Sequence, residues 1–152
     1  MYDTGDGVAK SDVEAMRWYK KAGDQGHAEA QFFLGTFYAH GRSVKQNFAK
    51  ATELWRSAAE LGHADAQCHF GIHLYNGRGV KQSDKEAARW FRKAADQGNV
   101  KAQYNLGLLY MEGRGVKQSD TEAVKWLKEA AFQGSVEAQH NLRFLFESGR
   151  AE

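Results

Sequence analysis

The chain of 152 residues contains no proline, a single cysteine and no long run of apolar residues. One cysteine cannot close an intramolecular disulfide, so the fold does not depend on an oxidising compartment. A membrane-spanning helix needs about 20 consecutive apolar residues, and no segment approaches that length. A net charge of +2 is too small to predict a nucleic-acid or membrane partner. These absences favour a globular chain that is held together by packing alone.

Residues 1–12 (MYDTGDGVAKSD) also lack the basic and apolar segments of a secretory signal peptide. The chain is interpreted below as an excerpt of a longer array, so this absence assigns no compartment. The lone Cys68 is compatible with the cytoplasm.

Glycine, with 16 residues, is plentiful because it recurs at a fixed interval. The clearest marker of that interval is an Ala-Gln pair that returns every 36 residues, starting at Ala30, Ala66, Ala102 and Ala138. Two glycine series keep the same interval: Gly26, Gly62, Gly98 and Gly134, and Gly5, Gly41, Gly77, Gly113 and Gly149. A period of this length is typical of helical repeat proteins.

Each repeat predicts two helices. The first places apolar or small residues at helical spacing, as at Ala102, Leu106 and Leu109. The second opens with a capping box, in which a serine is followed three residues later by a glutamate. This motif occurs at Ser11–Glu14, Ser83–Glu86 and Ser119–Glu122, and Asn47 is the cap of the remaining copy. The predicted helices span residues 12–24, 27–40, 48–60, 63–76, 84–96, 99–112, 119–132 and 135–148.

Three of the first-type helices contain an internal glycine, at Gly35, Gly71 and Gly107. Such a glycine costs about 1 kcal/mol relative to alanine. We expect this cost to be offset by a bulky side chain, a tryptophan or another aromatic residue of the adjoining helix, that packs against the bare backbone. Arg143 stands at the corresponding place in the last repeat. The contact is therefore predicted to be absent or altered there.

Two helices of this length cannot enclose a core, so neighbouring pairs must stack into an α-solenoid. We predict one all-α array over residues 1–152, with repeats at 9–44, 45–80, 81–116 and 117–152. The start of the chain aligns with the end of a first-type helix and its loop: Tyr2, Gly5, Gly7 and Val8 match Tyr110, Gly113, Gly115 and Val116. Residues 1–8 are therefore predicted to be the tail of a truncated repeat. The alternative is a native start, with a partner covering the exposed face of the helix at 12–24.

The repeating unit resembles the Sel-one-like repeat (SLR) family, a relative of the tetratricopeptide repeat. The resemblance covers essentially the whole chain, and its clearest copy comprises Ala102, Gln103, Leu106, Gly107, Tyr110, Gly113, Gly115, Val116, Glu122, Ala123, Trp126, Lys128, Ala130, Ala131, Gln133 and Gly134. Lys45, Lys81 and Lys117 stand where the family often has proline. The resemblance implies a right-handed superhelical solenoid of antiparallel helix pairs that acts as a non-catalytic adaptor or scaffold.

In such an array the first helix of each pair is expected to line the concave face. The predicted partner-binding residues are Phe32, Thr36, Cys68, Ile72, Tyr75, Tyr104, Leu108, Met111, His140 and Phe144, with Ala39 and Glu147 on the same face. The predicted rim consists of Glu29, Asp65, Lys101, Glu112 and Glu137. An apolar groove of this kind suits a peptide or a partner helix. The alternative is that superhelical curvature buries these residues against one another.

Other functions have weaker support in the sequence. Self-association through the open ends, Tyr2–Ala22 and Leu142–Phe146, is the structural alternative. His69 and His73 lie one helical turn apart, as a zinc pair does, but they align with packing positions (Asn105 and Leu109) and no third ligand is placed near them. The sequence therefore predicts no metal or other cofactor, and no catalytic motif is recognised.

A row of basic residues follows one loop edge at the repeat spacing: Arg42, Lys45, Arg78, Lys81, Arg114, Lys117 and Arg150. Such a row could follow an anionic polymer or a membrane surface. We favour the simpler interpretation that these cations face helix C-termini and aid solubility, because no aromatic residues are interleaved for base stacking. No nucleic-acid partner and no membrane insertion are expected.

Overall fold

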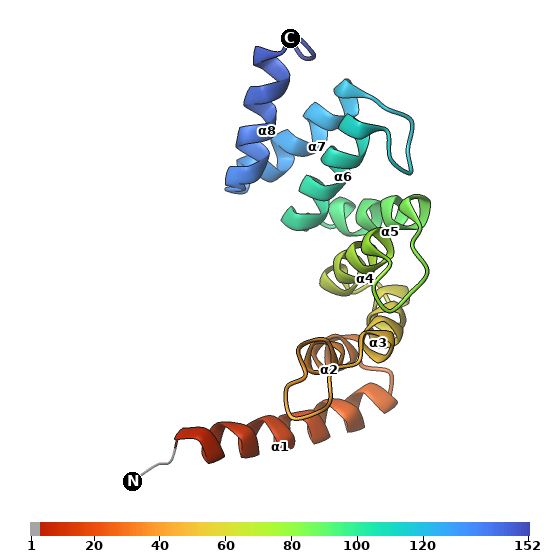
Figure 1. Cartoon of the computed structure of the whole chain (residues 1–152), viewed down its shortest axis with the longest axis vertical. Coiled ribbons are helices and arrows are strands. Elements are labelled where there is room, and N and C mark those ends of the chain that lie inside the picture. Colours follow the sequence, from red (N-terminus) through yellow and green to blue (C-terminus); the bar gives the residue numbers. More distant parts are fainter. Residues whose placement is uncertain (1–3) are drawn as a thin grey trace.

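The computed structural model describes residues 4–152, which form eight α-helices and no strand (Figure 1). The helices are α1 (Thr4–Asp24), α2 (Ala28–His40), α3 (Phe48–Glu60), α4 (Ala64–Asn76), α5 (Asp84–Asp96), α6 (Val100–Glu112), α7 (Asp120–Phe132) and α8 (Val136–Glu147). Each helix packs mainly on its neighbours in the sequence, and the array curves along its length. This confirms the predicted all-α solenoid of 36-residue helix pairs.

The capping residues that the sequence predicts are in place at three helices. Asn47, Ser83 and Ser119 each accept a hydrogen bond from the backbone N–H three residues later, at 3.0–3.2 Å. At the other end of the preceding helices, Gly41 and Gly77 adopt φ of 65°. This left-handed conformation suits glycine, and it reverses the chain toward the next helix.

The first helix differs from the prediction. It was expected to begin after Ser11, but α1 starts at Thr4 and runs through Gly5 and Gly7. In later repeats the turn is held by the preceding helix, because the backbone N–H of Asn47 donates to Tyr38 O at 2.9 Å. Ser11 has no such helix before it within residues 4–152, so the α-helix continues instead. Tyr2 lies outside the described residues, and the truncated repeat at 1–8 stays a prediction.

The internal glycines are places where a side chain of the next helix packs directly against the helix backbone. A Cβ atom at Gly35 would lie 2.7 Å from Trp55 Nε1, and one at Gly71 would lie 2.8 Å from Phe91 Cε1. The predicted aromatic contact is therefore confirmed at these two sites. At Gly107 the neighbour is Leu127, 2.8 Å away, because this repeat has leucine at the position of the aromatic residue.

Glutamines join one repeat to the next. Gln97 Nε2 donates both to Gly62 O at 3.0 Å and to Gln67 Oε1 at 2.9 Å. Gln133 repeats the pattern with Gly98 O and Gln103 Oε1. The ladder is incomplete at its first step. Leu61 stands where these repeats have Gln97 and Gln133, and the buried Oε1 of Gln31 has no hydrogen-bond partner.

We expect Gly71→Ala to lower the free energy of unfolding by about 1–3 kcal/mol, because the added methyl group collides with the Phe91 ring. Alanine is otherwise the better helix former, so a loss would identify the contact as its cause. Urea denaturation measures the change. In a Phe91→Ala background the same substitution should cost nothing, and an equal cost in both backgrounds would contradict the packing explanation.

We also expect Leu61→Gln to raise the free energy of unfolding by about 0.5–1.5 kcal/mol. Leu61 is exposed, and a glutamine there could reach both Gly26 O and the unpaired Gln31 Oε1. The matched control is Leu61→Glu, which has nearly the same size but, when ionised, no hydrogen to donate. Equal stability of the two variants in urea would show that the ladder adds nothing at this step.

Candidate partner-binding groove

The helices α4, α6 and α8 lie on the inner side of the curve, and α3 and α5 lie on the outer side (Figure 1). Two adjacent cavities of about 480 and 240 Å³ open between the inner helices. Ile72 of α4 and Asn105 of α6 line both of them, so they form one continuous surface. We call the two cavities together the groove.

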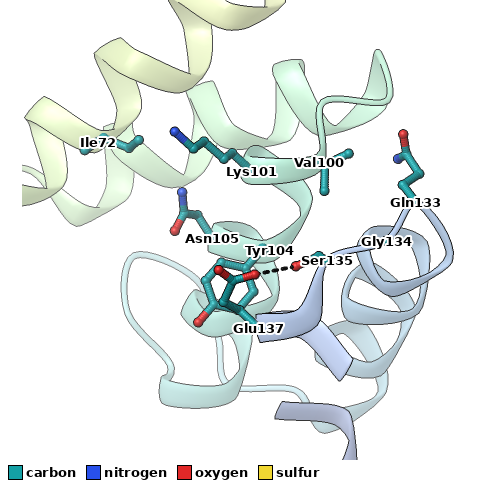
Figure 2. Close-up of a pocket in the computed structure, with 9 residues that line it drawn as sticks. All are labelled: Ile72, Val100, Lys101, Tyr104, Asn105, Gln133, Gly134, Ser135 and Glu137. Carbon is teal, nitrogen blue, oxygen red and sulfur yellow. Dashed lines mark hydrogen bonds between the residues drawn. The ribbon is translucent and has the colours of Figure 1, made fainter. Parts of the chain in front are cut away.

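The larger cavity is drawn in Figure 2. In this view Ile72 and Lys101 lie along its upper side, and Tyr104 and Glu137 lie toward its lower edge, where Ser135 Oγ donates to Glu137 at 3.3 Å. Its lining consists of Ile72, Val100, Lys101, Tyr104, Asn105, Gln133, Gly134, Ser135 and Glu137. The smaller cavity is lined by Ile72, Tyr75, Asn76, Phe91, Asn105, Leu108, Leu109 and Glu112.

The structure brings together part of the predicted site. Ile72, Tyr75, Tyr104 and Leu108 line the groove, and the predicted rim residues Lys101, Glu112 and Glu137 border it. Phe32, Thr36 and Met111 are half-buried outside the groove. Phe32 stacks on His63 with 4.9 Å between ring centroids. On α8, His140, Phe144 and Glu147 are exposed, and neither cavity includes them.

Two predicted residues do not line any open surface. Cys68 is only 1% exposed and Ala39 only 7%, and both belong to the hydrophobic core. A short side chain at these positions is covered by its neighbours, which is the burial that the sequence left open as an alternative. The same burial raises the pKa of the Cys68 thiol to about 12. Cys68 is therefore corrected from a groove residue to a core residue.

Asn105 is the central residue that sequence reasoning missed. It was treated as a packing position because it aligns with His69, yet it is half-buried and faces both cavities. Its side chain makes no hydrogen bond within residues 4–152, whereas Asn141, one repeat later, donates to Glu137 O at 2.9 Å. The sequence did contain a sign of this role, because Asn105 is a polar amide among the apolar residues of its helix. The amide offers both a hydrogen-bond donor and an acceptor to a bound chain.

The histidine pair serves packing. His69 and His73 lie against Trp55, with ring centroids 5.1 and 4.8 Å away. Each Nδ1 is paired with a backbone carbonyl oxygen, of Asp65 at 2.8 Å and of Arg78 at 3.0 Å. Burial lowers the pKa of both rings. Within the described residues, no three side chains of the metal-ligating types gather around them.

Most arginines of the basic row are engaged inside the array. Arg42 pairs with Asp12 at 2.8 Å, Arg114 with Asp84 at 3.1 Å and Arg150 with Asp120 at 2.8 Å. In the repeat where Phe48 replaces the aspartate, the guanidinium of Arg78 lies 5.1 Å from the centre of its ring. The row thus ties each loop to an earlier helix, a role that the sequence analysis did not assign.

The family model of the Sel1 repeat matches residues 1–27, 28–63, 64–99 and 100–135. The chain therefore belongs to the Sel1 repeat family, as the resemblance to Sel-one-like repeats implied. The matched units keep the 36-residue period but begin at a different point of the cycle from the repeats that we numbered. None of the curated proteins matches the chain.

Several solved structures are similar. A Sel1 repeat protein from Oxalobacter formigenes is 38% identical with a TM-score of 0.81, over 86% of this chain and 54% of that one. A protective antigen of uropathogenic Escherichia coli strains, which displays an SLR fold, is 36% identical with a TM-score of 0.84, over 88% of this chain and 29% of that one. The chain thus spans about half and under a third of these two relatives.

Helicobacter pylori cysteine-rich protein B shares the fold, with 24% identity and a TM-score of 0.69, over 89% of this chain and 97% of that one.

Sel1 repeats generally bind protein partners, and they are generally non-catalytic modules. Among residues 4–152, no helix combines the length and the apolar character needed to cross a membrane.

The lowered pKa of His69 and His73 makes stability depend on pH. The unfolded chain protonates these rings near pH 6.5, and the folded chain protonates them only at lower pH. The stabilisation of the folded state is therefore complete above pH 6.5 and is lost as the pH falls below 6.5. We expect a slope of at most about 1.4 kcal/mol per pH unit for each ring. The double variant His69→Asn/His73→Leu, which copies Asn105 and Leu109, should flatten the profile in urea unfolding between pH 7 and pH 5. A profile as steep as that of the parent chain would contradict this assignment.

Proposed function

We propose that the groove binds an extended peptide or a helix of a partner protein. The observation that carries the proposal is the continuous surface between α4, α6 and α8, on which Ile72 and Asn105 join two cavities. Tyr104 and Leu108, four residues apart on α6, place an aromatic and an aliphatic side chain in successive cavities. Apolar side chains of a ligand can enter both of them at once.

The polar groups around the groove are expected to determine how a ligand is oriented more than how tightly it binds. Lys101 and Glu137 border the larger cavity, and Glu112 borders the smaller one. Exposed charges of both signs add little binding energy but select how a ligand lies and how fast it associates. The unpaired amide of Asn105 suits the backbone of an extended ligand, which presents one donor and one acceptor per residue.

Self-association through the ends is the second candidate. Trp18 on α1 is 70% exposed, and Phe144 and Phe146 on α8 are 49% and 40% exposed, so both predicted ends carry apolar surface. The contact that joins α2 to α3 needs a glycine, however, and Arg143 occupies that position on α8. A second copy cannot continue the solenoid there in the same geometry. The groove is therefore the better supported site.

The test begins with peptides selected from a displayed random library on the full chain. Tyr104→Glu and Leu108→Glu should each weaken a selected peptide by about 30-fold or more, because an unpaired carboxylate would be buried under the ligand. Isothermal titration measures the affinity, and circular dichroism verifies that helicity is retained.

Trp18→Glu is the matched control, since it removes an exposed apolar side chain outside the groove. It should leave the affinity unchanged. Selected peptides that bind all three variants as well as the parent chain would overturn the groove assignment. Light scattering of the parent chain across a dilution series runs alongside, and a mass that rises with concentration would favour self-association.

A further inference from the structure

A third cavity, of about 370 Å³, lies on a different face of α6 from the groove, between α5, α6 and the loop that follows α6. Its apolar lining includes Ala88, Leu106, Tyr110 and Val116. Four cationic side chains of α5 surround it: Lys85, Arg89, Arg92 and Lys93. No carboxylate lines it, in contrast to the two cavities of the groove. We call it the basic cavity.

None of the four cations forms an ion pair within residues 4–152, where the ion pairs involve other residues. Arg92 is held in place, because its Nη1 donates to Tyr110 Oη at 2.9 Å and its guanidinium lies 5.6 Å from the Trp126 ring centre. Lys93 Nζ lies 4.5 Å from the Trp90 ring centre. Lys85 and Arg89 make no hydrogen bond in this part of the chain. Their charges are thus available to a ligand.

The full set of four cations occurs in one repeat, although α1 has three of them, Arg17, Lys20 and Lys21, with Val13 at the place of Lys85. The corresponding positions of α3 are Ala49, Glu53, Arg56 and Ser57, and those of α7 are Thr121, Lys125, Lys128 and Glu129. Both of those helices mix charges or omit them. On α5, Lys85 faces Arg89 and Arg89 faces Lys93 at the i,i+4 spacing, where like charges destabilise a helix. Arg92 and Lys93 are stabilised by their contacts with Tyr110, Trp126 and Trp90, whereas the repulsion between Lys85 and Arg89 has no such compensation among the described residues.

We infer that the basic cavity is a second docking site, which binds an acidic segment of a protein partner by inserting an apolar side chain between flanking carboxylates. Charge complementarity selects the sign of the ligand. The concave apolar floor fits one side chain, whereas a flat lipid surface could not enter it. Tyr110 is engaged by Arg92 and lies at the floor, so the cavity lacks the free aromatic platform that single-stranded nucleic acid uses.

The probe is a short capped peptide with phenylalanine at its centre and glutamates on both sides, titrated into the ¹⁵N-labelled full chain. Amide shifts should concentrate at residues 85–93 and 115–116, and affinity should fall as salt is added. The same peptide with glutamines in place of glutamates should bind at least about tenfold more weakly. Shifts confined to the groove, or equal binding of both peptides, would overturn the inference.

Lys85→Gln/Arg89→Gln should weaken the acidic peptide by about tenfold or more. Because it removes like-charge repulsion, this variant should melt at the same temperature as the parent chain or higher, so lost binding cannot be ascribed to unfolding. Lys45→Gln/Arg143→Gln removes the same charge at two exposed positions outside the cavity, which are not equivalent to the cluster, and should bind as the parent does. Equal weakening by both double variants would show a net-charge effect and overturn the site.

Two further arms separate this site from other partners and from the groove. Vesicles of phosphatidylserine and a short RNA are titrated under the same conditions, and tighter binding of either than of the acidic peptide would overturn the choice of a protein partner. Leu108→Glu, which disables the groove, should leave binding of the acidic peptide intact. The two docking sites can therefore fail or succeed independently.

Discussion

The close approach of a large side chain to a bare glycine backbone sets the distance between paired helices throughout this array. Trp55, Phe91 and Leu127 each fill the space that a Cβ atom at Gly35, Gly71 or Gly107 would occupy. Because the glycine position repeats every 36 residues, successive pairs meet in nearly the same way, and the curvature accumulates regularly. The groove is a product of that regularity, since it lies where three equivalent helices face inward.

Two polar ladders hold this packing in register. Glutamines bridge carbonyl oxygens of neighbouring repeats, and Arg42, Arg114 and Arg150 each reach an aspartate that lies 30 residues earlier in the sequence. The glutamine bonds lie partly inside the protein, where an unpaired polar atom is costly. The arginine pairs lie nearer the surface, where their contribution is modest. Both ladders also reach the groove, because Gln133 lines the larger cavity and the Arg114 guanidinium lies 4.2 Å from the ring centre of Tyr75, which lines the smaller one.

Much of the fold could be predicted from the sequence because the same residue types recur at the same positions of successive repeats. The period, the caps at Ser83 and Ser119, and the aromatic contacts at Gly35 and Gly71 follow from local patterns that occur several times. The groove was predicted less well. Residues at the same position of successive repeats have different neighbours in the structure, so they are not equally exposed. Cys68 is covered within the array, Tyr104 reaches the cavity with a longer side chain, and His140 is exposed on the last helix. The extension of α1 to Thr4 and the face of Asn105 likewise depend on neighbours that a repeat pattern does not specify.

The two ends of the array are not equivalent, because Leu61 replaces the glutamine that would bridge the first two helix pairs. In repeat proteins, cooperativity comes from the coupling between neighbouring units, and folding spreads through the interfaces that couple most strongly. The interfaces bridged by Gln97 and Gln133 have a hydrogen bond that the first interface lacks. The coupling that the glutamine bridges supply is thus confined to the later repeats, which are the ones that carry both docking surfaces.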